Sequence, residues 1–283
     1  MTGFCSHRFE DAAQMPQSDF AHPHADVLGV KVSAVNLDQA VVLADRWIAA
    51  GKPGYICVTC VHGVMEAQTD SRLRRVLNGA VVNTPDGMPM TWVGRLQGFK
   101  EMDRVFGPDL MLAVCRLSVE RGYRNFLLGG KPGVAQCLAE RLVSAYPGLI
   151  IAGTFTPPFG ALSPEQEQEM LTAVRNAEPH IVWVGLGAPK QEWFMAQWSD
   201  RFEVPLLVGV GAAFDYHTGA LRDSPRWVKR AGLQWLHRLI QEPRRLWLRY
   251  LRTNPAFVWH IVRQFAGLRR SATGFEAGSP NTQ

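Results

Sequence analysis

Short apolar runs alternate with helix-like stretches along most of this chain, and this rhythm constrains the fold more than any other feature. Strands separated by helices predict βαβ units and a parallel sheet. We therefore expect an α/β fold, a Rossmann-like parallel sheet flanked by helices, with the ligand at the carboxyl ends of the strands. The predicted strands are residues 55–61, 80–83, 125–128, 149–154, 181–184 and 205–210, and the predicted helices are residues 63–77, residues 109–121, one that ends at Tyr146 and one capped by Ser163.

The composition fits one large α/β domain, or such a domain with an appendage. Of the 283 residues, 47% are hydrophobic and 19% are charged, which excludes disorder over most of the chain and excludes collagen-like, coiled-coil and disulfide-scaffold proteins. The five cysteines are odd in number and lie mostly among apolar residues, so we expect a reducing cytoplasm. The longest apolar runs are about ten residues where a membrane span needs about 20, and the N-terminus lacks the apolar core of a signal peptide.

Charge is distributed unevenly along the chain. Residues 1–221 contain 18 Lys and Arg against 22 Asp and Glu, a net charge of −4, whereas residues 222–270 contain 12 against 2, a net charge of +10. Such a basic section favours an anionic partner. We expect flexible tails at residues 1–25 and 271–283, an α/β domain at residues 26–221 and a basic helical appendage at residues 222–270.

The basic appendage has the pattern of amphipathic helices. On a helix that starts at Pro243, the side chains of Arg245, Arg249 and Arg252 share one face, and the aromatic residues between them lie away from it. Pro243 and Pro255 predict a division into about three short helices. An anionic membrane surface is the favoured partner, a solvated arginine face is the alternative, and nucleic acid is disfavoured because no known binding module is present.

Three loops that follow predicted strands combine glycine with polar side chains. In residues 83–89, two prolines and a glycine fix the backbone around Asp86, which either caps a turn or serves chemistry. Residues 129–133 place Lys131 at a helix start, so this loop is either an anion site or a tight connection. Residues 185–192 place Lys190 and Gln191 in the first turn of a helix, where both can face a phosphate or a sugar.

Other patterns are weaker. Cys57 and Cys60 have apolar neighbours and no second pair, so we interpret them as strand packing rather than as a metal or redox site. His62 and His217 lie near loop ends, and each is either a base or a structural histidine. The chain has no D-x-D pair to hold a metal against a nucleotide sugar, and we expect neither a metal nor a cofactor.

Six blocks of sequence, in order, resemble a known family. They are TPDGMPMTW (84–92), RVFGPDLM (104–111), FLLGGKPGVA (126–135), VGLGAPKQEWFM (184–195), GVGAAFDYHTGALRDSPRW (209–227) and GLQWLHRLIQEPRRLWLRY (232–250). Together they span about residues 27–252 and look like the WecG/TagA/CpsF family, bacterial glycosyltransferases of glycosyltransferase family 26. One block alone carries little weight, but six in the same order are highly specific.

This resemblance implies transfer of a sugar from a UDP-sugar to a polyprenyl-diphosphate-linked saccharide at the cytoplasmic face of the membrane. The sugar would be N-acetylmannosamine, its uronic acid or glucose, and the product an exopolysaccharide or another cell-surface polymer. The resemblance also implies inversion at the anomeric carbon, no requirement for a metal, a peripheral membrane location, and homo-oligomers that rearrange on the membrane.

The resemblance also assigns roles to residues of this sequence. Asp86 would be the general base, Arg104 would face the leaving diphosphate, and Thr59 would line the pocket. The family often has Asn two residues after this threonine, whereas this chain has Val61, so a polar contact is either lost or supplied by His62. The implied substrate-binding residues are His62, Asn83, Gly130, Lys131, Gly187, Lys190, Gln191, Gly211, Asp215, Arg238, Arg245 and Arg249.

Two alternative functions belong to other classes. A nucleotide-dependent oxidoreductase or epimerase would need a G-x-G-x-x-G loop near its first strand, which this sequence lacks. A non-catalytic nucleotide- or nucleic-acid-binding module would use the basic appendage, and its binding to DNA would weaken strongly with salt.

Overall fold

The computed structural model describes residues 20–267, apart from the side chains of Arg226 and Arg245. Strand β1 begins at His24, two residues inside the predicted N-terminal tail, and residues 1–19 and 268–283 lie outside the described part. The strands are β1 His24–Val27, β2 Val30–Ser33, β3 Tyr55–Thr59, β4 Val82–Pro85, β5 Arg124–Gly129, β6 Ile150–Phe155, β7 Ile181–Gly185 and β8 Leu206–Gly209. The helices are α2 Leu37–Ala49, α3 Val61–Thr69, α4 Ser71–Asn78, α5 Met88–Leu96, α6 Gly107–Arg121, α7 Val134–Ala145, α8 Pro164–Ala177, α9 Lys190–Phe202, α10 Ala213–His217, α11 Arg226–Arg230, α12 Gln234–Gln241 and α13 Pro243–Phe265.

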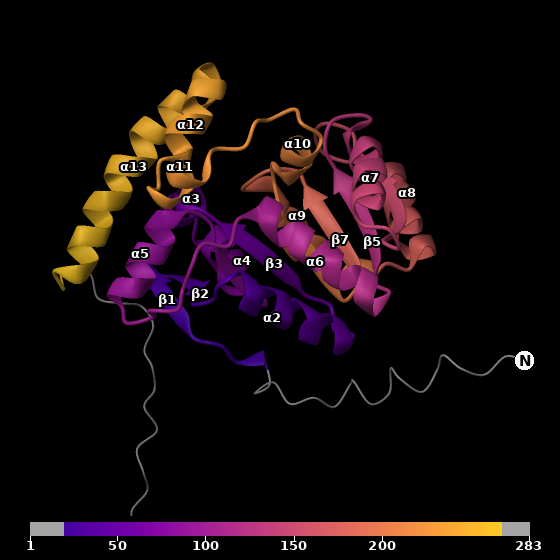
Figure 1. Ribbon diagram of the computed structural model, residues 1–283, viewed down its shortest axis with the longest axis horizontal. Coiled ribbons are helices and arrows are strands. Elements are labelled where there is room, and N and C mark those ends of the chain that lie inside the picture. Colours follow the sequence, from indigo (N-terminus) through magenta and orange to yellow (C-terminus); the bar gives the residue numbers. More distant parts are fainter. Residues whose placement is uncertain (1–19, 268–283) are drawn as a thin grey trace, which may run out of the picture.

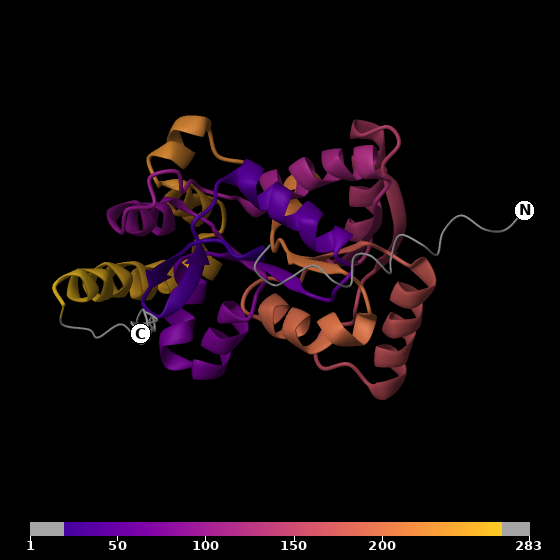
Figure 2. The same cartoon turned by 90° about the horizontal axis from the view of Figure 1, so that it is seen from below.

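Six parallel strands form the central sheet, in the order β4-β3-β8-β7-β5-β6 (Figure 1). Helices α2, α6 and α7 cover one face and α4, α8 and α9 cover the other, as the view from below shows (Figure 2). The predicted α/β fold is therefore confirmed. Because all six strands are parallel, their carboxyl ends meet at one edge of the sheet, where ligands bind in such folds.

Strand β3 shows why the central strands are continuous apolar runs. Ile56 and Val58 pack into the core beneath α2 and α6, while Cys57 packs into the opposite core beneath α4 and α9. A strand that is buried on both faces has no polar side to alternate with. Cys57 is fully buried, and burial raises the pKa of its thiol, in agreement with the packing interpretation.

The predicted helix over residues 63–77 is two helices, because Asp70 ends one and begins the other. Its backbone N–H donates to the carbonyl of Glu66, which closes α3. Its carboxylate accepts from the backbone N–H groups of Arg72 and Leu73, which caps α4. The apolar spacing alone did not show this break. By contrast, the predicted Ser163 cap is present as a full capping box with Gln166.

The prediction that Pro255 divides the appendage is wrong, since α13 runs unbroken through it. A proline inside a helix leaves a carbonyl one turn earlier without its backbone donor and normally bends or ends the helix. Here Leu246 and Phe257 are buried against the body on either side of the proline. Tertiary anchoring of both halves therefore offsets the local cost. Pro243 does begin α13, as predicted.

The appendage lies against one end of the α/β domain. Helix α13 packs beside α3, and the yellow helix flanks the small β1–β2 hairpin at the left of Figure 1. Its far end is fixed by Gln264, whose side chain accepts from the backbone N–H of Leu28 at 3.0 Å and donates to the carbonyl of Asp26 at 2.8 Å. Across residues 20–267, no helix combines the length and apolarity needed to cross a membrane.

Candidate active site

A carboxylate and a guanidinium meet at the carboxyl end of β4. Asp86 follows this strand, and its backbone N–H donates to the carbonyl of Thr59 on β3 at 2.9 Å. The backbone N–H of Val105 donates to the carbonyl of Pro85 at 2.9 Å, which brings the next segment alongside. As a result, Nε of Arg104 lies 3.6 Å from Oδ1 of Asp86. The rigid Pro-Asp-Gly turn thus holds a carboxylate beside a cation.

Burial and positive charge act on Asp86 in opposite directions. Burial raises the pKa of Asp86, and the guanidinium groups of Arg104 and Arg238 partly oppose that rise. The guanidinium of Arg104 also stacks 4.2 Å above the ring of Phe106, which holds it in place. A carboxylate with a raised pKa accepts a proton more readily than an exposed one, as a general base must.

The appendage supplies further groups to the same place. Arg104 donates a hydrogen bond to the side-chain oxygen of Gln234 on α12. Arg238, one turn later on α12, lies 6.0 Å from the ring centre of Tyr216 and 3.7 Å from Glu242. Residues 222–270 and the α/β domain therefore build this site together.

His62 and Arg249 are also brought together, at the contact between α3 and α13. Burial lowers the pKa of His62, and the positive charge of Arg249 lowers it further. Neutral His62 can therefore accept or donate a hydrogen bond near neutral pH. Thr59, at the end of β3, is buried, and its hydroxyl has no hydrogen-bond partner within the described part of the chain. The side chain of Arg245 lies outside the described part of the structure.

Three glycine loops lie at the carboxyl edge of the sheet, after β5, β7 and β8, beside the part that carries Asp86. The N–H of Gly130 donates to the carbonyl of Gly185 at 3.0 Å, and a Cβ at Gly129 would come within 2.7 Å of that carbonyl oxygen. The N–H of Gly211 donates to Oε1 of Gln191 at 2.9 Å. Gly130, Gly187 and Gly211 all have positive φ. Partly exposed glycine backbone therefore follows β5, β7 and β8 at the carboxyl edge of the sheet.

The two lysines of these loops lie at the rim. Lys131 and Lys190 are exposed, and Nζ of Lys190 lies 4.8 Å above the ring of Phe159. Both are near the glycine loops, but neither is part of the buried site.

Two predicted residues are placed differently from the rest. Asn83 is buried and turns away from the carboxyl edge, since Nδ2 donates to the carbonyl of Lys31 on β2 at 2.9 Å. This contact joins the hairpin to the sheet. Asp215 lies on α10, where its backbone carbonyl accepts from Leu221 at 3.0 Å. The other lone histidine, His217, contacts the carbonyl of Pro108 at 3.1 Å and is structural.

Comparison with known proteins identifies the family of this chain. A model of the glycosyl transferase WecG/TagA/CpsF family matches residues 25–271. The chain belongs to this family.

This WecG/TagA/CpsF glycosyltransferase has a curated relative in Bacillus spizizenii. The two chains are 29% identical over 221 residues, which cover 78% of this chain and 83% of the relative. The relative is named an N-acetylglucosaminyldiphosphoundecaprenol N-acetyl-beta-D-mannosaminyltransferase. The matched region includes the glycine loops, the Asp86 turn and the appendage, so the family extends over the whole site.

Sequence reasoning missed several residues that the structure places in the candidate site. Gln234, Tyr216 and Tyr250 lie around Arg104 and Arg238, but only the folded appendage brings them there. Glu192 was also missed, although it stands next to Gln191 in a quoted block. It is only 3% exposed, but an acidic residue in the first turn of a helix normally faces solvent, so no local signal in the sequence indicates this burial.

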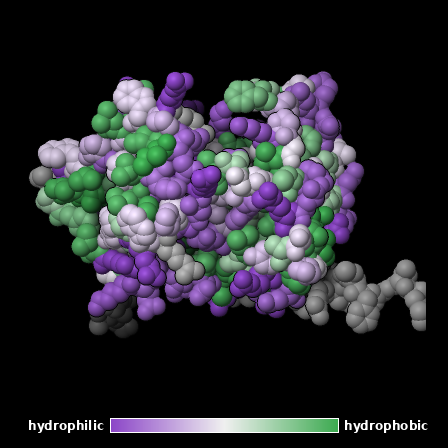
Figure 3. Space-filling view, turned by 45° about the horizontal axis from the view of Figure 1, so that its top comes forward, coloured by the Kyte–Doolittle hydropathy of each residue, from purple (hydrophilic) through white to green (hydrophobic). Residues whose placement is uncertain are grey.

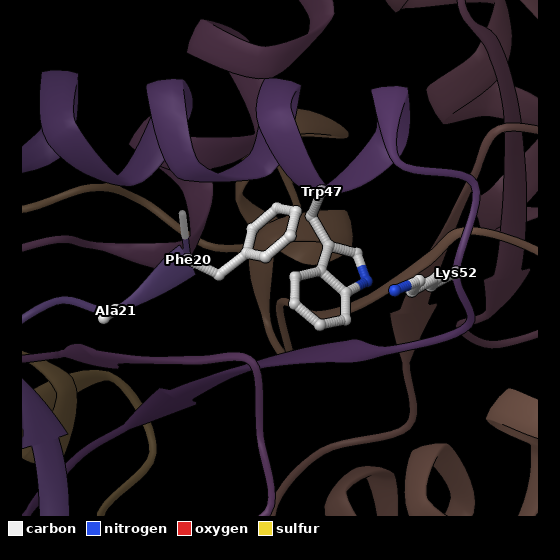
Figure 4. Close-up of a pocket in the computed structure, with 4 residues that line it drawn as sticks. All are labelled: Phe20, Ala21, Trp47 and Lys52. Carbon is white, nitrogen blue, oxygen red and sulfur yellow. The ribbon is translucent and has the colours of Figure 1, made fainter. Parts of the chain in front are cut away.

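A pocket of about 260 Å³ lies elsewhere, lined by Phe20, Ala21, Trp47 and Lys52 (Figure 4). Trp47 and Lys52 precede β3, so the pocket lies near the amino end of that strand, opposite the edge that carries Asp86. Among residues 20–267, no three His, Cys, Asp or Glu side chains are grouped as a metal site.

Proposed function

We propose that this glycosyltransferase moves a sugar from a UDP-sugar to a polyprenyl-diphosphate-linked saccharide, with inversion and without a metal. The observation that carries the proposal is Asp86, partly buried at the carboxyl edge of the sheet, 3.6 Å from the guanidinium group of Arg104 and within the electrostatic influence of Arg238. The name of the Bacillus relative supports N-acetylmannosamine as the transferred sugar and N-acetylglucosaminyl-diphosphoundecaprenol as the acceptor. Such a product belongs to the assembly of a cell-surface polymer.

The proposed reaction is a single displacement. A hydroxyl oxygen of the acceptor attacks the anomeric carbon, its proton passes to the carboxylate of Asp86, and the bond to the diphosphate breaks with its electron pair. Attack from the side opposite the leaving group inverts the anomeric carbon. Arg104 and Arg238 stabilise the negative charge that develops on the leaving diphosphate. In this proposal the two guanidinium groups neutralise the charge of the leaving diphosphate, which a metal ion does in other sugar transferases.

The donor is assigned to the glycine half of the site. Gly130, Gly187 and Gly211 leave room for close approach of the diphosphate, and Gln191 fixes the loop after β8. Lys131 and Lys190 add positive charge at the rim, and Asp215 flanks it on α10. Thr59 and His62 face the sugar. This chain has Val61 where the family often has asparagine, and His62 supplies the polar contact that the asparagine would make.

We propose that the appendage, residues 222–270, binds the inner face of the cytoplasmic membrane. Figure 3 shows apolar residues gathered at the left end of the molecule, over α5 and α13. The exposed side chains of Arg244 and Arg252 on α13 suit anionic lipid. Off the membrane, a second copy of the chain would cover part of this face. The exposed apolar side chains of α5 and the appendage are Trp92, Leu96, Trp227, Leu233, Trp235, Leu236, Ile240, Trp247, Leu248, Leu251, Val258, Trp259, Val262 and Phe265.

Flotation with anionic vesicles tests the membrane proposal. Wild type should float with phosphatidylglycerol vesicles, and Ile240→Glu combined with Trp259→Glu should remain at the bottom of the gradient. Both side chains are more than half exposed, so the fold should tolerate the change. A double variant that floats like wild type would refute this surface.

The transfer reaction is tested by UDP release from a panel of UDP-sugars with polyprenyl-diphosphate-N-acetylglucosamine in detergent. Asp86→Asn should lower acceptor-dependent release at least about 100-fold, because the variant cannot take the proton. Asp200→Asn, at an exposed position on α9, is the matched control and should keep wild-type activity. Unchanged release by Asp86→Asn would remove Asp86 from its role, and absence of both release and UDP binding by wild type would overturn the proposed function.

A further inference from the structure

Glu192 is a buried acid with no salt-bridge partner in the described part of the structure. It lies in the first turn of α9 and is only 3% exposed. Its titratable neighbours are the thiols of Cys57 on β3 and Cys60 at the start of α3. The negative charge of Glu192 contributes to the raised pKa of each thiol. Burying a carboxyl group without a cation destabilises the folded state, so its presence here favours a functional role.

One oxygen of Glu192 takes part in a chain of hydrogen bonds to the donor loops. Its Oε1 accepts from Nε2 of Gln191 at 3.2 Å, and Oε1 of Gln191 accepts from the N–H of Gly211 at 2.9 Å. The backbone N–H of Gly211 requires an acceptor, so it fixes which end of the carboxamide faces Glu192. A Cβ at Gly209 would lie 3.1 Å from Nε2, so the space around this carboxamide is tight.

The other oxygen of Glu192 is buried and has no hydrogen-bond partner among residues 20–267, and the same is true of the hydroxyl of Thr59. Side chains alternate along a strand, so Thr59 points to the same side of the sheet as Cys57, which packs beneath α9. Both orphan oxygens therefore lie on the α9 side of β3. Buried polar atoms without partners are uncommon and indicate a group that binds there.

We propose that Glu192 is a positioning residue for the donor, which holds Gln191 against the loop after β8 and offers its second oxygen to a hydroxyl of the transferred sugar. This proposal rests on the proposed function, because it takes a nucleotide sugar as the ligand. The ligand group is a hydroxyl or an amide oxygen of the sugar, which accepts a hydrogen bond from the protonated carboxyl group of Glu192 and lies beside the hydroxyl of Thr59.

The charge state of Glu192 supports this arrangement. Burial raises its pKa to about 7. Burial also raises the pKa of each facing thiol, Cys57 and Cys60, so both stay neutral in this range. Below pH 7 the carboxyl group holds a proton and can donate as well as accept. Above pH 7 the carboxyl group loses this proton and can no longer donate a hydrogen bond to the sugar, so binding of the sugar should weaken.

Calorimetric binding of UDP-N-acetylmannosamine and of UDP alone tests the proposal at pH 6 and pH 8.5. Wild type should lose about tenfold in affinity for the UDP-sugar at the higher pH, the size of one hydrogen bond, and much less for UDP. Glu192→Gln, which resembles the protonated acid, should bind equally at both pH values. Glu192→Ala should lose the preference for UDP-sugar over UDP at both, and Glu169→Gln, exposed on α8, should behave as wild type.

The outcomes separate the two proposals. If wild type binds UDP-N-acetylmannosamine but Glu192→Gln keeps the wild-type pH dependence, Glu192 has no positioning role and the proposed function stands. If wild type binds neither UDP nor the UDP-sugar, the proposed function fails first. If Glu192→Ala does not fold, the pH dependence of binding in wild type and in Glu192→Gln still tests the positioning role of Glu192.

Discussion

Because Glu192 is buried, we expect that replacing it by glutamine stabilises the protein at alkaline pH and not at acid pH. In the folded state its pKa rises from 4.5 to about 7, because burial disfavours the charged form. Below pH 4.5 the folded and the unfolded chain both hold the proton, so the native state bears no penalty. As the pH rises towards 7, the unfolded chain releases its proton first, and stability falls.

The size of this effect follows from the same two values. Multiplying the difference between 4.5 and about 7 by about 1.4 kcal/mol per pKa unit gives a loss of about 3–4 kcal/mol once the folded group is ionised, of which about 3 kcal/mol falls above pH 4.5. Glutamine at position 192 does not ionise and keeps the acceptor for Nε2 of Gln191. The free energy of unfolding of Glu192→Gln, relative to wild type, should therefore increase by about 3 kcal/mol between pH 4.5 and pH 8.5.

Urea unfolding followed by tryptophan fluorescence measures this difference at several pH values. All other groups titrate alike in the two proteins, so their contributions cancel in the comparison. Glu169→Gln, at an exposed position on α8, should show no such trend. A constant difference between Glu192→Gln and wild type from pH 4.5 to pH 8.5 would refute the reasoning, because it would mean that Glu192 is ionised in the folded protein throughout.

Three further predictions concern other parts of the molecule. Arg104→Lys loses the planar fork that serves Asp86 and Gln234, and should lower kcat for transfer about 10- to 100-fold while the melting temperature stays close to wild type. Gly129→Ala, at φ +116° and against the carbonyl of Gly185, should cost about 2–3 kcal/mol of unfolding free energy in urea. Leu246→Ala removes a fully buried anchor of α13 and should cost about 3 kcal/mol, visible as faster amide hydrogen exchange along that helix.

The fold was predictable because its signals are local. Most central strands are short apolar runs, and four of the six, β4, β5, β7 and β8, end at glycine or proline. Each connection is long enough for a helix. The capping box at Ser163 is likewise written in four consecutive residues. The break between α3 and α4 at Asp70 was not predicted, because the apolar spacing continues through it. Only the capping hydrogen bonds of the Asp70 carboxylate show that there are two helices.

The site was predictable only in part, because half of it depends on tertiary contacts. The Asp86 turn and the glycine loops stand out as strand-to-helix connections. The appendage residues around Arg104 do not, since nothing local to Gln234 indicates that it contacts a residue 130 positions away. The burial of Glu192 is hidden for a similar reason. An acid in the first turn of a helix normally faces solvent, where it stabilises the positive end of the helix dipole.

Helix α12 links the proposed membrane surface to the site through its periodicity. Gln234 and Arg238 are four residues apart and therefore share the face that meets Arg104 and Tyr216. Leu236 and Ile240, offset by about half a turn, are 39% and 73% exposed. One short helix thus carries site residues on one side and exposed apolar side chains on the other. Any shift of α12 moves both sets together, so a contact made by the outer face alters the position of the groups beside Asp86.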